Sequence, residues 1–311
     1  MSNNRKHRSQ DDYYACPICK QPVTPTANGL FCPRDGVEYP VHNGIPDFVM
    51  EDQTKSINPF LRSFDSVATI YERPSLNEGP SWYGVMDQIN AELGLPSIEE
   101  LIGMLTKMVD ARNGLGLDVA CGTGFVTRSI AQNMRLVYGI DLSVGMLEQA
   151  TEYAREKGIR NVRFARSSAE RLPFSDAVLD GVTSSLALQL FPDTVAALSE
   201  MARVMKTGAR LVVLTLAKGD PSVYKLFLER MEEPTFKRFT ECLRTSIPLD
   251  EDIILEAIRN SDVEKLEKYL PQVGIHLFDA EELDAYLSQT GFKGLTYNIY
   301  GHLILFQAER G

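Results

Sequence analysis

Two acidic residues and a glycine-containing turn stand where buried strands would end. Asp118 closes one apolar run, and the small residues that follow it include Gly122 and Gly124; a second apolar run closes on Asp141. Glycine allows close approach of a backbone to a ligand, amides at a helix start favour electron-rich atoms, and an acid at a strand end accepts ribose hydroxyls. These residue types at this spacing predict a site for a nucleotide-type cofactor.

The elements that must position these residues follow the order strand, tight turn, helix, strand. After the turn, Val126, Ile130 and Met134 recur at helical spacing, which predicts a helix. Asp118 and Asp141 end the strands on either side of that helix. In a parallel sheet both acids would therefore face one crevice at the carboxyl edge.

A dinucleotide-binding dehydrogenase is the alternative for this turn. Its G-x-G-x-x-G pattern requires a third glycine where this chain has Thr127. An acid four residues before the first glycine, Asp118, also disfavours a nearby pyrophosphate, whereas it suits a cofactor that carries a positive amine and a sulfonium.

The stretch from about residue 111 to 217 resembles class I S-adenosylmethionine-dependent methyltransferases, in particular the ubiquinone/menaquinone (type 11) branch. Residues 168–174, reading SAERLPF, match the family segment beside the adenine. Residues 184–189 match the strand end that borders the active site, and residues 203–208 match the turn before the fifth strand. The resemblance implies an α/β fold with a Rossmann-like, seven-stranded sheet and helices on both faces.

The resemblance also implies a set of cofactor-binding residues. They are Tyr71, Asp118, Ala120, Gly122, Gly124, Asp141, Leu142, Ser168, Ala169, Glu170 and Ser185. The chain departs from the family at Ala120, which replaces a glycine, and at Ser168, which replaces the acid expected to hold the adenine amine. Further departures are Thr207 and Ala209, which replace proline and glycine.

No nucleophile or acid pair stands out as a catalytic constellation. Methyl transfer from a sulfonium is an in-line displacement in which alignment of donor and acceptor is the main requirement. A base is needed only if the acceptor must lose a proton. The candidates for such a role are Gln189, after the fourth strand, and the histidines His276 and His302; the catalytic residue stays unknown at this point.

Near the N-terminus, Cys16 and Cys19 form a C-x-x-C knuckle, followed by Cys32 and Asp35. These four residues suit a structural zinc site, with His42 as the alternative fourth ligand and a metal-free unit as the other outcome. Residues 32–48 resemble the zinc-ribbon family of small tRNA-methyltransferase activators, with the ending YPVHNGIP at 39–46. The resemblance implies that this unit recruits a protein partner.

The chain is expected to divide into four parts. These are a disordered tail (1–12), a zinc-ribbon-like domain (13–50), a helical cap and linker (51–110), and a methyltransferase domain (111–311) with a helical lid inserted at 219–274. Aromatic and apolar residues are expected near the substrate: Trp82 and Tyr83 from the cap, and Tyr224, Phe227, Met231 and Phe236 from the lid.

Composition limits the function classes. Of the 311 residues 44% are hydrophobic, and the net charge of −10 disfavours a broad nucleic-acid footprint, which requires clustered Lys and Arg. No apolar run reaches membrane-spanning length, and the N-terminus lacks the apolar stretch of a secretory signal. A cytoplasmic protein is expected, whose five cysteines are reduced thiols or metal ligands.

Three functions follow from these observations. The favoured one is methyl transfer to a small, mostly apolar acceptor, such as a quinol, a lipid or a secondary metabolite. A ribosomal or transfer RNA base methyltransferase is the first alternative, because zinc-binding N-termini also occur in that class. A non-catalytic scaffold that binds the cofactor and recruits a partner is the second.

Overall fold

The computed structural model describes residues 13–50, 59–74, 80–218 and 268–311, together with scattered positions between 223 and 265. The predicted tail (1–12) and most of the predicted lid lie outside the described residues, including Tyr224, Phe227, Met231 and Phe236. Among the residues described, no helix combines the length and apolar character that a membrane span requires.

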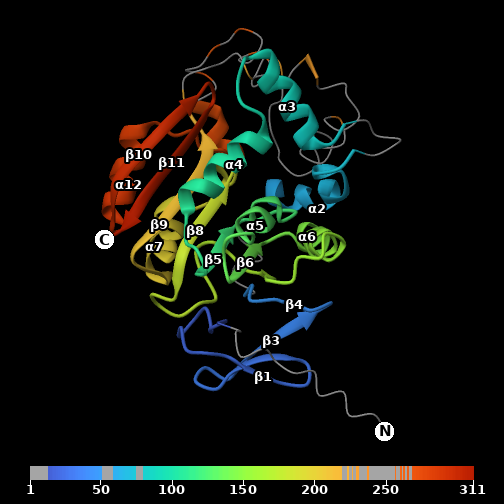
Figure 1. Ribbon diagram of the computed structural model, residues 1–311, viewed down its shortest axis with the longest axis vertical. Helices are drawn as coiled ribbons and strands as arrows, with labels where there is room; N and C mark the ends of the chain where they lie inside the picture. Colours follow the sequence, from blue (N-terminus) through green and yellow to red (C-terminus); the bar gives the residue numbers. More distant parts are fainter. Residues whose placement is uncertain are drawn as a thin grey trace.

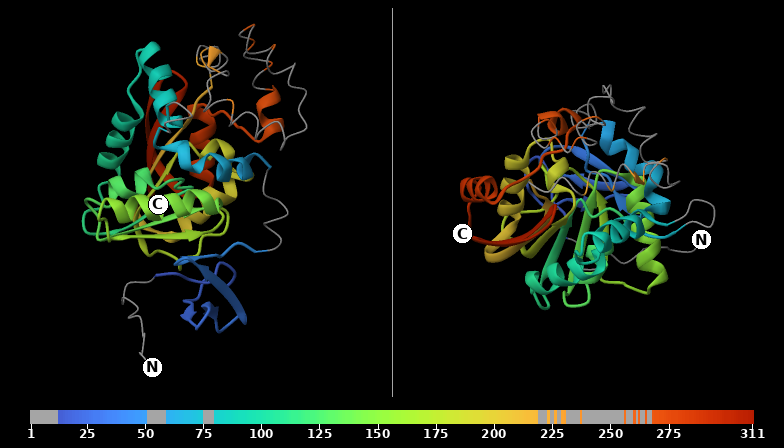
Figure 2. Two further views of the ribbon diagram at one scale, coloured as in Figure 1. Left: turned by 90° about the vertical axis from the view of Figure 1, so that its right-hand side faces the viewer. Right: turned by 90° about the horizontal axis from the view of Figure 1, so that it is seen from above.

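The N-terminal unit is a small antiparallel sheet in the order β1-β2-β3-β4. Its strands are β1 (Thr24–Pro25), β2 (Gly29–Cys32), β3 (Val37–His42) and β4 (Ile45–Pro46). The sheet lies at one end of the molecule, drawn in blue in Figures 1 and 2.

The main sheet has seven strands in the order β10-β11-β9-β8-β5-β6-β7, which confirms the predicted fold class. Its strands are β5 (Leu115–Val119), β6 (Leu136–Asp141), β7 (Val162–Arg166), β8 (Leu179–Ser185), β9 (Met205–Leu216), β10 (Phe292–Tyr300) and β11 (Leu303–Arg310). Five neighbouring strands run parallel, in the order β7, β6, β5, β8 and β9. Strand β11 is antiparallel to both of its neighbours, β9 and β10. Strand order reverses at β5, which has β6 on one side and β8 on the other.

Helices cover the sheet and the edge at which β5 and β6 end. They are α2 (Pro59–Tyr71), α3 (Trp82–Glu92), α4 (Ile98–Val109), α5 (Phe125–Ile130), α6 (Val144–Glu156), α7 (Thr194–Val204) and α12 (Ala280–Gln289), with short 3-10 turns η1 (Leu188–Leu190) and η2 (Leu270–Val273). Polar side chains cap several of these helices at their N-termini. Ser143 accepts from the Met146 amide at the start of α6, and Ser97 forms a capping box with Glu100 at the start of α4.

The sheet divides the core into two clusters, because alternate strand residues point to opposite faces. Val137 of β6 belongs to the cluster that includes residues of α3, α4, α5 and α6, whereas Tyr138 belongs to the cluster that includes residues of α7 and α12. The N-terminal unit completes that second face. Tyr14 and Phe174 both contact the Tyr138 ring edge-on, at centroid distances of 5.1 and 5.0 Å, and Phe48 lies 5.3 Å from Tyr14.

Backbone pairing fixes the same interface. The Ala15 amide donates to the Pro173 carbonyl, and the Phe48 amide donates to the Arg166 carbonyl, each at 2.8 Å. Arg166 also forms an ion pair with Asp47 at 2.9 Å. The small sheet is therefore built into the core of the protein as a packing layer.

One predicted boundary differs from the structure. Residues 203–208 are expected as a turn before the fifth strand, but β9 already begins at Met205. Its register to β8 jumps from Met205, opposite Leu179, to Arg210, opposite Gly181. Gly208 has φ +80° within the extra residues, so the expected turn is an irregularity inside the strand.

Candidate cofactor and metal sites

A cavity opens at the carboxyl ends of β5, β6, β7 and β8, where the strand order reverses and where ligands bind in open α/β sheets. Ten of the eleven predicted cofactor residues line it. They are Tyr71, Asp118, Ala120, Gly122, Asp141, Leu142, Ser168, Ala169, Glu170 and Ser185. The eleventh, Gly124, begins α5 with φ +76° and faces Ala150 and Phe164, so it shapes the turn without lining the cavity.

The turn after β5 has an unusual backbone. Ala120, Gly122 and Gly124 all have positive φ, of 55°, 52° and 76°. For Gly122 an added Cβ would meet no atom within 4 Å, so its conformation, and not crowding, favours glycine there. The same conformation at Ala120 is strained, because an alanine Cβ disfavours the left-handed region.

Asp118 is buried at the end of β5, with 1% of its surface exposed. Its Oδ2 accepts from the Thr127 hydroxyl at 2.7 Å, and its Oδ1 accepts from the Thr183 hydroxyl at 3.0 Å. Burial raises the pKa of Asp118 from 3.8 to about 7, against the lowering effect of these two hydroxyls. A cationic ligand beside this carboxyl would favour its charged form.

Asp141 presents its carboxylate at the end of β6. Its Oδ2 accepts from the Gly122 amide at 2.8 Å, and its Oδ1 accepts from the Ser143 amide at 2.9 Å. Burial raises the pKa of Asp141, although these amides act in the opposite direction. Each oxygen keeps a further lone pair, so the carboxylate is held ready to accept two ligand hydroxyls.

Residues of the helices α2 and α3 also line the cavity. Tyr71 lines it from the end of α2, and Glu72 ties that end to the cofactor turn. Glu72 accepts from Arg128 at 2.5 Å and from the Thr123 hydroxyl at 2.9 Å, and the Arg128 side chain is only 3% exposed. Burial raises the pKa of Tyr71 well above its usual range, so its phenol stays protonated.

Apolar residues that the sequence reasoning did not assign complete the walls of the cavity. They include Phe64, Val126, Met146, Leu186, Leu190 and Phe191. Tyr83, which is expected near the substrate, also lines the cavity. Trp82 does not line it; its ring stacks on that of Tyr71, with the ring centroids 6.3 Å apart. One of these residues could have been found from the sequence. Phe64 lies seven residues before Tyr71, a helical spacing that places both on the same face of α2.

The three candidate catalytic residues do not line this cavity. Gln189 uses its amide group internally, donating to the Leu186 carbonyl at 2.7 Å and accepting from Thr215 at 2.9 Å. His276 pairs with Glu282 at 2.7 Å, and His302 is buried in the turn between β10 and β11. The structure does not bring these three side chains to the cofactor residues.

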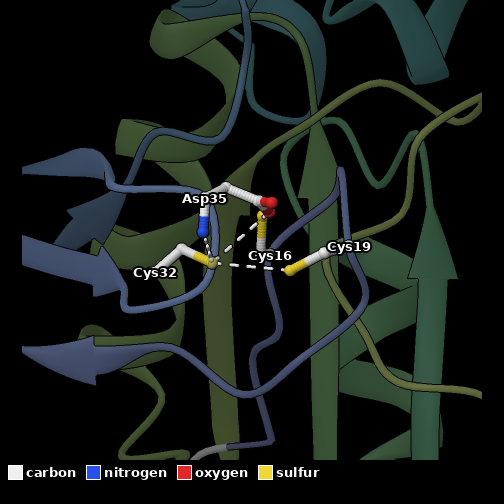
Figure 3. Close-up of side chains that lie close together, drawn as sticks. All are labelled: Cys16, Cys19, Cys32 and Asp35. Carbon is white, nitrogen blue, oxygen red and sulfur yellow. Dashed lines mark hydrogen bonds between the residues drawn. The ribbon is translucent and has the colours of Figure 1, made fainter.

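The predicted metal ligands converge in the N-terminal unit (Figure 3). The ligand atoms of Cys16, Cys19, Cys32 and Asp35 all lie within 4.8 Å of one another. The Cys19 and Cys32 sulfurs are 3.5 Å apart, and the Cys16 sulfur lies 3.1 Å from Asp35 Oδ2. Three sulfurs and one carboxylate oxygen at this spacing fit a tetrahedral zinc ion. The alternative ligand His42 is not part of the cluster among the residues described.

A tyrosine supports this cluster from behind. The Tyr39 hydroxyl lies 3.0 Å from the Cys16 sulfur, and its ring contacts Phe48 at 5.0 Å. A hydrogen bond to a ligand sulfur orients that ligand, and Phe48 belongs to the interface with the main sheet. The cluster is thereby connected to the core through buried contacts.

Comparisons with known proteins find matches for two separate parts of the chain. Residues 117–213 match the family described as methyltransferase domain, and residues 15–44 match the family of Trm112p-like proteins. These matches confirm both resemblances. The uncharacterized methyltransferase YcgJ of Bacillus subtilis is 34% identical over 143 residues, which cover 45% of this chain and 56% of that protein.

The demethylmenaquinone methyltransferase of Lactiplantibacillus plantarum is 37% identical over 119 residues, which cover 37% of this chain and 50% of that enzyme. The chain thus spans about half the length of these curated relatives. Among solved structures, phosphoethanolamine N-methyltransferase 2 of Haemonchus contortus aligns with a TM-score of 0.50 at 15% identity, covering 74% of this chain and 60% of that one. At that identity the alignment is evidence for the fold alone.

Proposed function

We propose that this chain, whose core is a methyltransferase domain and whose N-terminal unit is Trm112p-like, transfers the methyl group of S-adenosylmethionine to a small, mostly apolar acceptor. The observation that carries the proposal is the convergence of Asp118, Asp141 and the turn around Gly122 on one cavity. These groups offer anionic acceptors to a ligand with hydroxyls and positive charge.

The residues of this cavity bind and align the reactants. S-adenosylmethionine supplies an activated methyl group bound to a sulfonium. Asp141 would accept the ribose hydroxyls, and the backbone of the turn at Gly122 would hold the methionine part. Asp118 stabilises the positive charge from β5, and holding the reacting atoms in line contributes roughly 7–11 kcal/mol.

The nature of the walls supports an apolar acceptor. Phe64, Tyr71 and Tyr83 approach from the cap, and Leu190 and Phe191 approach from the connection after β8. Such a lining binds apolar molecules by burying their surface. Exclusion of water by the same residues would also protect the charged donor until the acceptor is in place.

Three further points belong to the proposal. A structural zinc ion is held by Cys16, Cys19, Cys32 and Asp35, away from the methyl-transfer cavity. The Trm112p-like unit recruits a protein partner, and the protein acts in the cytoplasm. Gln189, His276 and His302 stay candidates for a proton-transfer role only if the acceptor binds outside the described cavity.

Label transfer tests the proposed acceptor class. Purified protein is incubated with methyl-labelled S-adenosylmethionine and an extract of the host cell, before and after ribonuclease treatment. We expect the label in the lipid or small-metabolite fraction, unaffected by ribonuclease and strongly reduced with an Asp141→Asn variant at a limiting cofactor concentration.

Two outcomes would favour the alternatives. Label that disappears with the RNA, together with steep inhibition of transfer by salt, would indicate an RNA methyltransferase. Cofactor binding without transfer to any fraction would indicate the scaffold.

A further inference from the structure

The loop after β7 places a carboxylate beside the proposed ribose site. Asp141 pairs with Arg166 across β6 and β7, and the Ser167 amide donates to the Asp141 carbonyl at 3.1 Å. The following residues, up to Arg171, all line the cavity. The loop therefore continues the cofactor edge outward from the strand that carries Asp141.

Within this loop, Ser168 and Glu170 hold each other. The Ser168 hydroxyl donates to Glu170 Oε2, and the Glu170 amide donates to the Ser168 oxygen at 3.2 Å. Ser168 is buried, with 5% of its surface exposed. The serine hydroxyl is thus occupied in fixing the orientation of the glutamate side chain.

The second oxygen of that carboxylate has no partner. Glu170 Oε1 is shielded from solvent and accepts no hydrogen bond from any residue that the structure describes. A buried acceptor left unsatisfied is costly, so a donor supplied by a ligand would stabilise it. Because Glu170 lines the cavity, the ligand in that cavity is the natural source of the donor.

We propose that Glu170 Oε1 accepts a hydrogen bond from the exocyclic amine of adenine and so selects the base of the cofactor. The inference rests on the proposed function, because it takes the ribose to lie on Asp141. The sugar then has two substituents to place: the sulfonium arm extends toward Gly122 and the apolar walls, and the base extends toward the loop after β7.

This assignment gives a physical account of the serine at position 168. The sequence pattern leads one to expect an acid there to hold the adenine amine, and its absence would remove one hydrogen bond. Ser168 instead orients Glu170, two residues further on, whose free oxygen restores an anionic acceptor. Ser168 is then a positioning residue, and Glu170 makes the contact.

An ionised carboxylate only accepts hydrogen bonds, and this property yields a selective test. S-inosylhomocysteine has a carbonyl oxygen where S-adenosylhomocysteine has the amine, and it carries a proton on the neighbouring ring nitrogen N1. At the position of the amine it would set two acceptors against each other. A glutamine at position 170 can donate as well as accept, so it would tolerate both bases.

Calorimetric titration of both compounds into the full chain measures the ratio of their affinities. We expect the wild type to bind the adenosyl compound at least about tenfold more tightly, the effect of one charge-assisted hydrogen bond. In Glu170→Gln the ratio should fall to about one. In Asp141→Asn both affinities should fall by a similar factor, and the ratio should stay as in the wild type.

The outcomes separate the inference from the function on which it rests. Affinities for both compounds that stay at their wild-type values in Glu170→Gln would overturn the role of Glu170 while leaving cofactor binding intact. An equal loss for both compounds in that variant would also overturn it, since the carboxylate would then be acting on the methionine ammonium. A wild type that binds neither compound would overturn the proposed function itself. Thermal melts of each variant establish that it is folded.

Discussion

Asp118 combines burial with a proposed function that calls for negative charge. The two threonine hydroxyls that it accepts from do not compensate fully for lost hydration, so burial raises its pKa to about 7. The sequence predicts the place of Asp118, because it ends an apolar run. It does not predict that Thr127 and Thr183 donate to this carboxyl, because they come from α5 and β8.

The raised pKa predicts a pH dependence of stability. Between about pH 4 and pH 7 the folded chain holds a proton on Asp118 that the unfolded chain has lost. The contribution of this residue to the free energy of unfolding therefore falls as pH rises, with a slope of up to about 1.4 kcal/mol per pH unit. Chemical denaturation should show that the free energy of unfolding declines less between pH 5 and pH 7 for Asp118→Asn than for the wild type. Equal declines would mean that Asp118 is ionised throughout this range.

Ala120 offers a second prediction at this scale. Its φ of +55° places an alanine in a conformation that glycine adopts freely. Relief of that strain exceeds the extra entropy of an unfolded glycine, so Ala120→Gly should raise the free energy of unfolding by about 1 kcal/mol. Ala187→Gly, at φ −133° in the same cavity, is the matched control and should not stabilise. A destabilised Ala120→Gly variant would show that the turn is relaxed as it stands.

At the scale of elements, the N-terminal unit is a packing layer of the core. A cysteine pattern predicts the unit itself, because its ligands are local in sequence. The pattern does not predict where the unit docks, since contacts such as that of Tyr14 with Tyr138 join segments far apart in the chain. The aromatic residues that form them look like ordinary core residues in the sequence.

Docking of this kind predicts that a mutation in the unit destabilises the whole fold. Phe48 is 1% exposed and packs between Tyr14 and Tyr39, so Phe48→Ala should cost roughly 3–5 kcal/mol. Ile18→Ala, in the same unit but at a side chain that is 47% exposed, should change stability by less than about 0.5 kcal/mol. Loss of the small unit alone, with an unchanged main unfolding transition, would show that the two parts fold independently.

The cysteine cluster makes a separate prediction about metal content. Elemental analysis of the purified protein should find about one zinc ion per chain, lost in Cys16→Ser. Cys121→Ser is the matched control, because that cysteine is buried at the cofactor turn and should not affect metal content. Zinc retained in full by Cys16→Ser would contradict the assigned ligands.

At the scale of the whole molecule, the sequence predicts the sheet and the convergence of Asp118 and Asp141 on one cavity. Buried strands end in residues such as Asp118 and Asp141, and parallel topology then collects those ends at one edge. The sequence pattern does not predict side-chain contacts between segments that are far apart in the chain. The Glu72–Arg128 pair, which fastens the cap to the cofactor turn, is one such contact.

Gln189 shows that the place of a residue along the chain does not fix the direction of its side chain. Its position after β8 suggests a side chain directed at the ligand, but the amide group turns inward to Leu186 and Thr215. A position at the carboxyl edge therefore does not by itself indicate which way a side chain points.

The central claim is that S-adenosylmethionine binds at the edge formed by Asp118 and Asp141, and calorimetric titration tests it most directly. We predict measurable binding by the wild type and affinity reduced roughly ten- to a hundredfold in Asp141→Ala, because a charge-assisted hydrogen bond is lost. Asp180→Asn is the matched control: Asp180 lies at the opposite end of the parallel strands, where it accepts from the Leu115 amide, and this variant should bind like the wild type. Unchanged affinity in a folded Asp141→Ala variant would contradict the assignment.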